Sequence, residues 1–121
     1  MRAVKGREDP APRRNVLFVC SRNQWRSPTA EQVFRKHPAL SVRSRGTSAQ
    51  ARRRVTDDDV RWADAVLVME PKHRARLLAA FAPWPEGTAL HVLEIPDEYE
   101  YMDPELVELL QVAVSAALGV E

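Results

Sequence analysis

Short runs of apolar residues recur along the chain and predict strands. Residues 16–19 and 65–69 are continuous apolar runs, as expected for strands that are buried on both faces of a parallel sheet. Residues 40–43 form a weaker strand candidate, and residues 90–93 form a plausible fourth. We therefore expect four short strands.

One helical pattern follows the run at residues 16–19, and a second follows the strand candidate at residues 40–43. Ser27 is expected to cap a helix that has Pro28 at its first position, with its apolar side chains at helical spacing: Ala30, Val33 and Phe34. Thr56 is expected to cap a short second helix. Val55 and Val60 flank that cap at the spacing of a hydrophobic staple.

A third helical pattern follows the run at residues 65–69, and a fourth follows the strand candidate at residues 90–93. The third helix is expected to begin at Pro71, and one of its faces is apolar: Leu77, Leu78 and Phe81. The last is introduced by Asp103 and Pro104, a cap followed by a favourable first position. Its predicted inward face consists of Leu106, Leu109, Leu110, Ala113 and Ala117.

The alternation of strands and helices predicts an α/β fold. Right-handed crossovers then give a four-stranded parallel sheet with helices on both faces, a Rossmann-like three-layer sandwich. A length of 121 residues suits one domain. We assign that domain to residues 15–121. Residues 1–14 combine two prolines with five basic residues and no apolar periodicity, which predicts a flexible basic N-terminal arm.

Charge and composition narrow the classes of function. Residues 1–61 carry 15 Lys and Arg against 6 Asp and Glu, whereas residues 62–121 carry 3 against 11. A basic half suits an anionic ligand. No apolar stretch has the length of a signal peptide or a membrane span, so we expect a cytoplasmic protein with no membrane partner. Three scattered histidines lack the spacing of metal ligands and are interpreted as structural or solvated: His37, His73 and His91.

The lone cysteine, Cys20, cannot form an internal disulfide or a multi-thiolate metal site. It ends the first predicted strand, and ligands of open parallel sheets bind at that edge. The loop at 21–25 can form a nest of backbone N–H groups, and the positive end of the next helix stabilises a thiolate or a phosphate there. Arg26 can hold two phosphate oxygens with its guanidinium fork. We therefore predict a phosphate site with a reactive thiol.

The sequence from Cys20 to Ser27 has the pattern Cys-x5-Arg-Ser, and here the chain resembles the low-molecular-weight protein tyrosine phosphatases, as a short variant. The resemblance continues through Ser27-Pro28, Ala30-Glu31, residues 44–47 and Val68-Met69. It implies metal-independent and cofactor-free hydrolysis of a phosphate monoester through a phosphocysteine intermediate. The implied substrate is a phosphorylated protein, with phosphotyrosine first, or a small phosphomonoester. The same loop would hold phosphate and other oxyanions.

The resemblance also assigns roles to residues. It makes Cys20 the nucleophile and Arg26 the phosphate clamp, while Asn23 orders the loop and the Ser27 hydroxyl donates to the thiolate. The residues expected to bind phosphate are those of the loop and the first helical turn: Ser21, Arg22, Asn23, Gln24, Trp25 and Ser27.

A general acid is expected on a later loop, and two aspartates compete for the role. Asp97 stands in a segment similar to the acid loop of the family, with Tyr99 as a candidate wall of the substrate pocket. Asp103 directly precedes the last predicted helix, and we expect its carboxylate to cap that helix. We therefore assign the acid to Asp97.

The chain departs from the family pattern at several positions. Arg22 replaces the usual loop glycine, Trp25 replaces a second loop cysteine, and Glu98 replaces a proline. The stretch between Gly46 and Val55 is also short, which predicts the loss of one peripheral helix and part of the substrate wall.

Several alternatives remain beside phosphotyrosine hydrolysis. A phosphoarginine phosphatase is the nearest. In the family, one loop residue helps to distinguish phosphotyrosine from phosphoarginine enzymes, and the residue here, Gln24, matches neither group. Arsenate reduction needs further cysteines, which this chain lacks. A phosphate-binding module without turnover, or a nucleic-acid binder, would use basic side chains: Arg22, Arg43, Arg45 and residues 52–54. The set of Cys20, Arg26, Ser27 and Asp97 argues against both of these.

Overall fold

The computed structural model describes residues 13–120. Most of the predicted N-terminal arm, residues 1–14, lies outside the described residues. Arg14 is described and already belongs to the first strand, where it pairs with Leu40, so regular structure begins one residue before the start that we expected for the domain.

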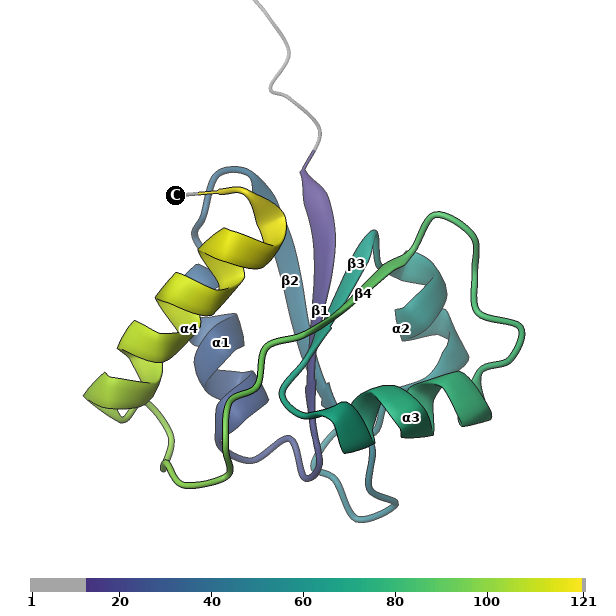
Figure 1. Cartoon of the computed structure of the whole chain (residues 1–121), viewed down its shortest axis with the longest axis horizontal. Coiled ribbons are helices and arrows are strands. Elements are labelled where there is room, and N and C mark those ends of the chain that lie inside the picture. Colours follow the sequence, from purple (N-terminus) through teal and green to yellow (C-terminus); the bar gives the residue numbers. More distant parts are fainter. Residues whose placement is uncertain (1–12, 121) are drawn as a thin grey trace, which may run out of the picture.

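Four strands and four helices alternate along the described chain (Figure 1). In order they are β1 (Arg14–Cys20), α1 (Arg26–Phe34), β2 (Leu40–Gly46), α2 (Asp57–Trp62), β3 (Ala65–Val68), α3 (Pro71–Ala80), β4 (Ala89–Val92) and α4 (Pro104–Leu118). The strands form one parallel sheet in the order β2-β1-β3-β4. The predicted four-stranded parallel α/β fold is therefore confirmed.

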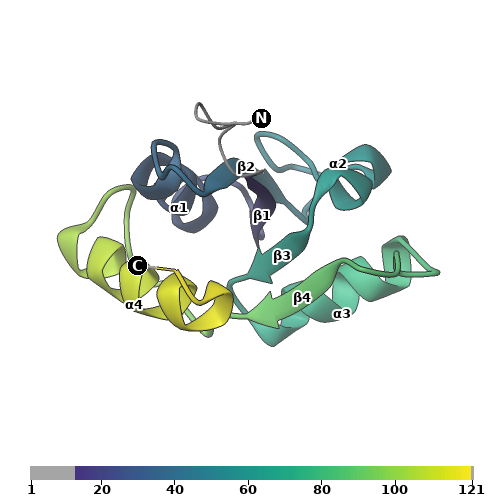
Figure 2. The same cartoon turned by 90° about the horizontal axis from the view of Figure 1, so that it is seen from above.

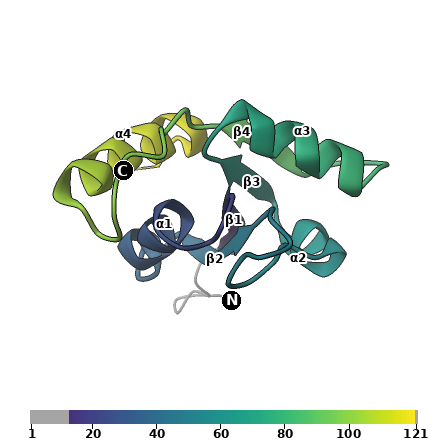
Figure 3. The same cartoon turned by 90° about the horizontal axis from the view of Figure 1, so that it is seen from below.

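Helices cover both faces of the sheet. Helices α1 and α4 lie on one side, and α2 and α3 lie on the other, as the views from above and below show (Figures 2 and 3). The carboxyl ends of the strands, with the loops that follow them, form the lower edge of the molecule in Figure 1. In open sheets this edge is where ligands bind.

The central strand β1 explains why its apolar run is continuous. Alternate residues point to opposite faces. Val16 and Phe18 pack in the core beneath α1 and α4, whereas Leu17 and Val19 pack in the core beneath α2 and α3. All four are fully buried, and each such side chain stabilises the fold by roughly 1.5–3 kcal/mol through the surface that it removes from water.

Strand β2 extends three residues beyond the segment predicted for it. Its polar carboxyl-terminal end is tolerated because each side chain there has partners. The hydroxyl of Ser44 donates to Glu31, and the guanidinium of Arg45 pairs with Asp59 at 3.0 Å. This extension carries β2 to Gly46, directly beside Cys20 in the sheet register.

The inward face of α4 differs from the predicted one. The residues that are buried follow each other at intervals of four: Leu106, Leu110, Val114 and Leu118. Leu109, which we placed inward, is 37% exposed. Ala113 and Ala117, which we also placed inward, are partly buried and pack against the core, so that Leu109 is the exposed member of the predicted face.

Two helix caps formed as expected. Asp103 caps α4, with its side chain accepting a hydrogen bond from the backbone of Glu105 at 2.9 Å. Thr56 and Asp59 form a reciprocal capping box at the start of α2. Each cap satisfies backbone N–H groups that the first turn of a helix leaves without a partner.

Candidate active site

The carboxyl end of β1 delivers Cys20 to the floor of a pocket of about 230 Å³. The loop between β1 and α1 forms most of the wall, and a distant segment completes it. The lining residues are Cys20, Ser21, Arg22, Gln24, Trp25, Arg26 and Asp97. Seven of the ten residues predicted for the site therefore meet at one pocket. Asn23 and Ser27 are buried, in contact with each other.

Ser27 lies against the sulfur, with its Oγ 3.0 Å from the Sγ of Cys20. The prediction that Ser27 also caps the helix was wrong, because α1 begins at Arg26 and Trp25 occupies the cap position without a side-chain bond. The Ser27 hydroxyl is engaged elsewhere: it accepts from Asn23 and donates to the carbonyl of Arg45 at 3.2 Å. The Ser27 hydroxyl thus contacts the sulfur of Cys20 and, through Asn23, helps to hold the loop.

Asn23 is the internal brace of the loop. It adopts a left-handed conformation with φ 54°, which asparagine tolerates better than most residues. Its side-chain amide is buried and donates to the hydroxyls of Ser27 and Ser44, each at 3.0 Å. The loop is thereby tied both to α1 and to the neighbouring strand β2.

Gly46 lets the loop approach β2 closely. A Cβ at this position would lie 2.6 Å from the carbonyl oxygen of Ser21 and 2.9 Å from the backbone nitrogen of Asn23, which no real side chain achieves. The segment after Gly46 then binds the back of the loop: the Thr47 backbone donates to Cys20, and that of Ser48 donates to Ser21, both at 2.9 Å.

Arg26 is held by partners that come from two other loops. Its Nη1 donates to the carbonyl of Ile95 at 2.8 Å and to the carboxylate of Glu70 at 3.0 Å. Its Nε lies 3.7 Å from the Oδ1 of Asp97. The side chain is only 2% exposed, so these contacts fix the guanidinium in the wall of the pocket.

Glu70 is a site residue that the sequence analysis missed. It follows β3 at the same sheet edge as Cys20. Burial alone would raise the pKa of this carboxyl, but the hydrogen bond and the charge of Arg26 outweigh burial and lower the pKa. A charged residue directly after a buried strand was the available signal.

His73 is the second missed residue. It is fully buried on α3, and its Nδ1 accepts a hydrogen bond from the backbone of Glu70 at 3.0 Å. Burial, aided by the charge of Arg26, lowers the pKa of His73 to about 4, so the ring is neutral near pH 7. A neutral ring whose Nδ1 accepts carries its proton on Nε2, which lies 2.9 Å from the hydroxyl of Ser21.

The two candidate acids lie in different surroundings. The side chain of Asp97 is 58% exposed and lines the pocket. Asp103 spends its carboxylate on the cap of α4 and is not among the lining residues. Tyr99, the predicted wall residue, packs against the core beneath α4 and donates its hydroxyl to Glu105 at 3.3 Å. Trp25, 40% exposed, is the aromatic residue in the wall.

Three of the basic side chains considered for nucleic-acid binding are already paired, and one of them is Arg53, which lies 3.2 Å from Glu31. Arg43 and Arg45 both bind the buried carboxylate of Asp59, each at 3.0 Å. Among residues 13–120, no group of three or more His, Cys, Asp or Glu side chains is placed to hold a metal ion. Within the same range, no helix combines the length and the apolar character that crossing a bilayer requires.

No protein-family model and no curated protein sequence matches this chain. Solved structures do match. The tyrosine phosphatase Wzb from Escherichia coli K30, in complex with phosphate, superposes with a TM-score of 0.67 at 24% identity, over 86% of this chain and 95% of that one. The YwlE arginine phosphatase from Geobacillus stearothermophilus gives 0.64 at 20%, over 88% and 94%.

A third structure carries the family name in full. SP-PTP, the low-molecular-weight protein tyrosine phosphatase from Streptococcus pyogenes, matches with a TM-score of 0.64 at 20% identity, over 88% of this chain and 91% of that one. The matches extend over nearly the whole of each neighbour. This chain has the fold of the low-molecular-weight protein tyrosine phosphatases.

Proposed function

We propose that this chain is a cysteine-dependent phosphatase that hydrolyses a phosphate monoester without a metal, through a phosphocysteine at Cys20. One observation carries the proposal: the sulfur of Cys20 lies 3.0 Å from the Ser27 hydroxyl, in a pocket whose wall contains the fixed guanidinium of Arg26. A nucleophile, an oxyanion clamp and a candidate acid are thus gathered around one space the size of a phosphoryl group and its substituent.

In the first step the thiolate of Cys20 attacks phosphorus, and the bond from phosphorus to the ester oxygen breaks. The hydroxyl of Ser27 supports the thiolate by turning its single proton from the carbonyl of Arg45 toward the sulfur. Asn23 continues to donate to the Ser27 oxygen, which keeps that oxygen in place during the turn. A hydrogen bond of this kind favours the anionic form of the nucleophile.

Arg26 compensates the charge on the equatorial oxygens. Its Nη1 is occupied by Ile95 and Glu70. Asp97 lies 3.7 Å from Nε, too far for a hydrogen bond, so Nε and Nη2 remain as a parallel pair of donors for the phosphate. Because the guanidinium is fixed before the substrate arrives, it needs little reorganisation as the charge develops.

Asp97 gives its proton to the leaving oxygen as that oxygen departs. In the second step water attacks phosphorus, the Asp97 carboxylate takes a proton from that water, and the bond from phosphorus to sulfur breaks. Inorganic phosphate leaves, and the thiolate of Cys20 is restored. One carboxylate thus acts first as an acid and then as a base.

Phosphotyrosine on a protein is the substrate class that we favour, and the cytoplasm, where a lone thiol stays reduced, is the compartment. The exposed indole of Trp25 in the pocket wall supports an aromatic leaving group, because ring faces stack. Phosphoarginine is the second candidate, since a neighbour of this fold is an arginine phosphatase. Gln24 lines the same pocket, so we expect it to lie near either group.

A turnover assay with p-nitrophenyl phosphate, run after dialysis against a chelator, tests the reaction. Hydrolysis that persists without metal and is inhibited competitively by vanadate or phosphate supports the proposal. Phosphate binding without turnover would identify a binding module instead. Comparing phosphotyrosine, phosphoarginine and phosphoserine peptides then assigns the substrate class, with the Cys20→Ser variant as the control for background hydrolysis.

A further inference from the structure

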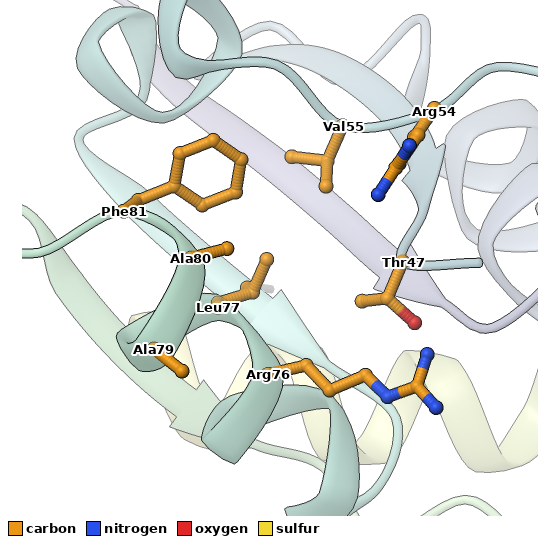
Figure 4. Close-up of a pocket in the computed structure, with 8 residues that line it drawn as sticks. All are labelled: Thr47, Arg54, Val55, Arg76, Leu77, Ala79, Ala80 and Phe81. Atoms are coloured by element: carbon orange, nitrogen blue, oxygen red, sulfur yellow. The ribbon is translucent and has the colours of Figure 1, made fainter. Parts of the chain in front are cut away.

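A second cavity lies on the other side of the sheet edge, between α3 and the segment that follows β2. Its volume is about 610 Å³, which is within the usual range of small-molecule pockets. Val55 and Leu77 form its floor and belong to the core beneath α2 and α3. The half-buried ring of Phe81 closes one end (Figure 4).

The opposite end of this groove is cationic. Figure 4 shows the guanidinium groups of Arg54 and Arg76 on either side of Thr47, away from the ring of Phe81. Both arginines are exposed, and neither guanidinium has a hydrogen bond or an ion pair with another residue of the described chain. In contrast, Arg43, Arg45, Arg53 and Arg61 all pair with carboxylates. Two unpaired positive charges beside one another favour an anion between them.

We propose that this groove binds a small amphipathic anion, an aromatic or branched apolar group that carries one carboxylate or phosphate. The apolar part lies against Phe81, Val55 and Leu77, and the anionic part lies between Arg54 and Arg76. Binding therefore combines burial of apolar surface with charge-assisted hydrogen bonds at one end. Neither contribution depends on Cys20 or on hydrolysis.

The position of the groove joins it to the active-site loop. Thr47, at the cationic end, donates its backbone N–H to the carbonyl of Cys20 at 2.9 Å. On the other wall, α3 carries His73, which contacts Ser21 of the loop. An occupant of the groove thus contacts both elements that support the loop from behind.

Two fluorescent probes of nearly the same shape test the proposal with the full chain. Anilinonaphthalene sulfonate has the apolar and anionic parts, whereas N-phenylnaphthylamine lacks the charge. The sulfonate should bind saturably and at least roughly tenfold more tightly than the neutral probe, because charge-assisted hydrogen bonds are worth that much. Equal affinity of the two probes would overturn the proposal.

Matched variants place the binding. Arg76→Ala and Phe81→Ala should each weaken the binding of the sulfonate, whereas Arg74→Ala should not, because Arg74 is also exposed on α3 but lies outside the groove. Cys20→Ser should leave the affinity unchanged, which separates this site from the catalytic pocket. An equal loss in Arg74→Ala and Arg76→Ala, or a loss in Cys20→Ser, would contradict it.

We also propose that His73 is a positioning residue for Ser21, an inference that rests on the proposed function. The backbone of Glu70 fixes the ring, and Nε2 then donates to the Ser21 hydroxyl. That hydroxyl therefore turns its own proton away from the ring. Because Ser21 lines the pocket of Cys20, its proton is available to a bound oxyanion.

Two replacements of His73 separate this role from simple packing. His73→Gln keeps a donor near the position of Nε2, whereas His73→Asn keeps only an acceptor near Nδ1 and so retains the contact with Glu70. The inhibition constant of vanadate should stay near the wild-type value in the Gln variant and rise several-fold in the Asn variant, as it should in Ser21→Ala.

Calorimetric binding of phosphate gives the same comparison without turnover. A chain that binds phosphate but does not hydrolyse esters would contradict the proposed function and leave the role of His73 open to this measurement. Wild-type affinity for phosphate in both His73→Asn and Ser21→Ala would overturn the positioning role.

Discussion

The guanidinium of Arg26 is the residue on which the geometry of the pocket depends most. Its Nη1 is bound by Glu70 and by the carbonyl of Ile95, so its remaining donors are aimed before a substrate binds. Lysine has the charge but not the planar fork. Arg26→Lys should therefore lower kcat/KM by roughly 10² or more.

The control for that variant is Arg22→Lys, at an exposed position of the same loop. It should change kcat/KM far less, because no partner fixes the side chain of Arg22 in the described chain. Steady-state kinetics on p-nitrophenyl phosphate measure both variants. Similar losses in the two would show that charge alone, not the held fork, is what the reaction uses.

The assignment of the general acid depends on the surroundings of two aspartates. Asp97 lines the pocket, whereas Asp103 caps α4. Asp97→Asn should lower kcat by roughly 10²–10⁴ with phenyl phosphate, whose leaving group needs a proton. The loss should be much smaller with p-nitrophenyl phosphate. Asp103→Asn should cost little, because asparagine caps nearly as well as aspartate. The reverse ranking on phenyl phosphate would move the acid to Asp103.

For single residues, the sequence predicts contacts within a short segment and misses contacts that the fold makes between distant segments. Cys20, Arg26 and Ser27 stand within one short motif, so their proximity follows from local structure. Glu70 contacts Arg26 and His73 contacts Ser21 across separations of 44 and 52 residues. A histidine without metal-ligand spacing gives no sign of its partner, because that partner is set by the packing of α3.

At the scale of elements, α4 shows how a helical pattern can be right in type and wrong in detail. The sequence predicts the helix, its cap at Asp103 and its apolar side. It does not separate Leu109 from Leu110, because both fit an apolar face of ordinary width. In the folded chain Leu109 is exposed and Leu110 is fully buried.

These neighbouring leucines form a matched pair for a stability measurement. Leu110→Ala should lower the free energy of unfolding by about 2–5 kcal/mol, because it opens a cavity in the core beneath α4. Leu109→Ala should lower it by less than about 1 kcal/mol. Urea denaturation at pH 7 measures both. Equal losses would show that Leu109 is buried and that the predicted inward face was correct.

The predicted start of α1 also differs from the observed one, for a related reason. Ser27 followed by Pro28 is a common beginning of a helix, and the pattern predicts that the hydroxyl caps it. In the folded chain the same hydroxyl lies beside Cys20 and Asn23. A serine hydroxyl can cap a helix or contact the active-site thiol, and the local sequence does not distinguish these two roles.

At the scale of the whole molecule, burial of His73 couples folding to pH. Burial lowers the pKa of the folded imidazole to about 4, whereas the unfolded chain titrates near the ordinary value of 6.5. Between these values the unfolded state binds the extra proton, so stability falls as pH decreases from about 6.5 to about 4. This one group accounts for a loss on the order of 3 kcal/mol.

His73→Gln should flatten that part of the pH profile, because glutamine does not titrate. The measurement is urea denaturation at several pH values between 7 and 4 for the wild type and the variant. Their difference isolates His73 from the carboxyl groups, which both chains share. Parallel profiles would show that the imidazole is charged or solvated in the folded state.

The order of the strands also belongs to this scale. Alternating strands and helices predict a parallel sheet, but the order β2-β1-β3-β4 depends on which strand pairs with which. The fully apolar runs of β1 and β3 are consistent with their central places, and the partly exposed β4 lies at an edge. This order sets Cys20, Gly46 and Glu70 at one edge of the sheet and so assembles the site.

The phosphocysteine at Cys20 is the central step of the proposed mechanism, and it can be trapped and identified. Wild-type chain quenched in acid during turnover of p-nitrophenyl phosphate can be digested and its peptides identified by mass spectrometry. We predict one phosphoryl group on Cys20, no such adduct and no turnover in Cys20→Ser beyond a trace, and a larger trapped fraction in Asp97→Asn. Turnover that continues in Cys20→Ser, or a phosphoryl group on another residue, would contradict the mechanism.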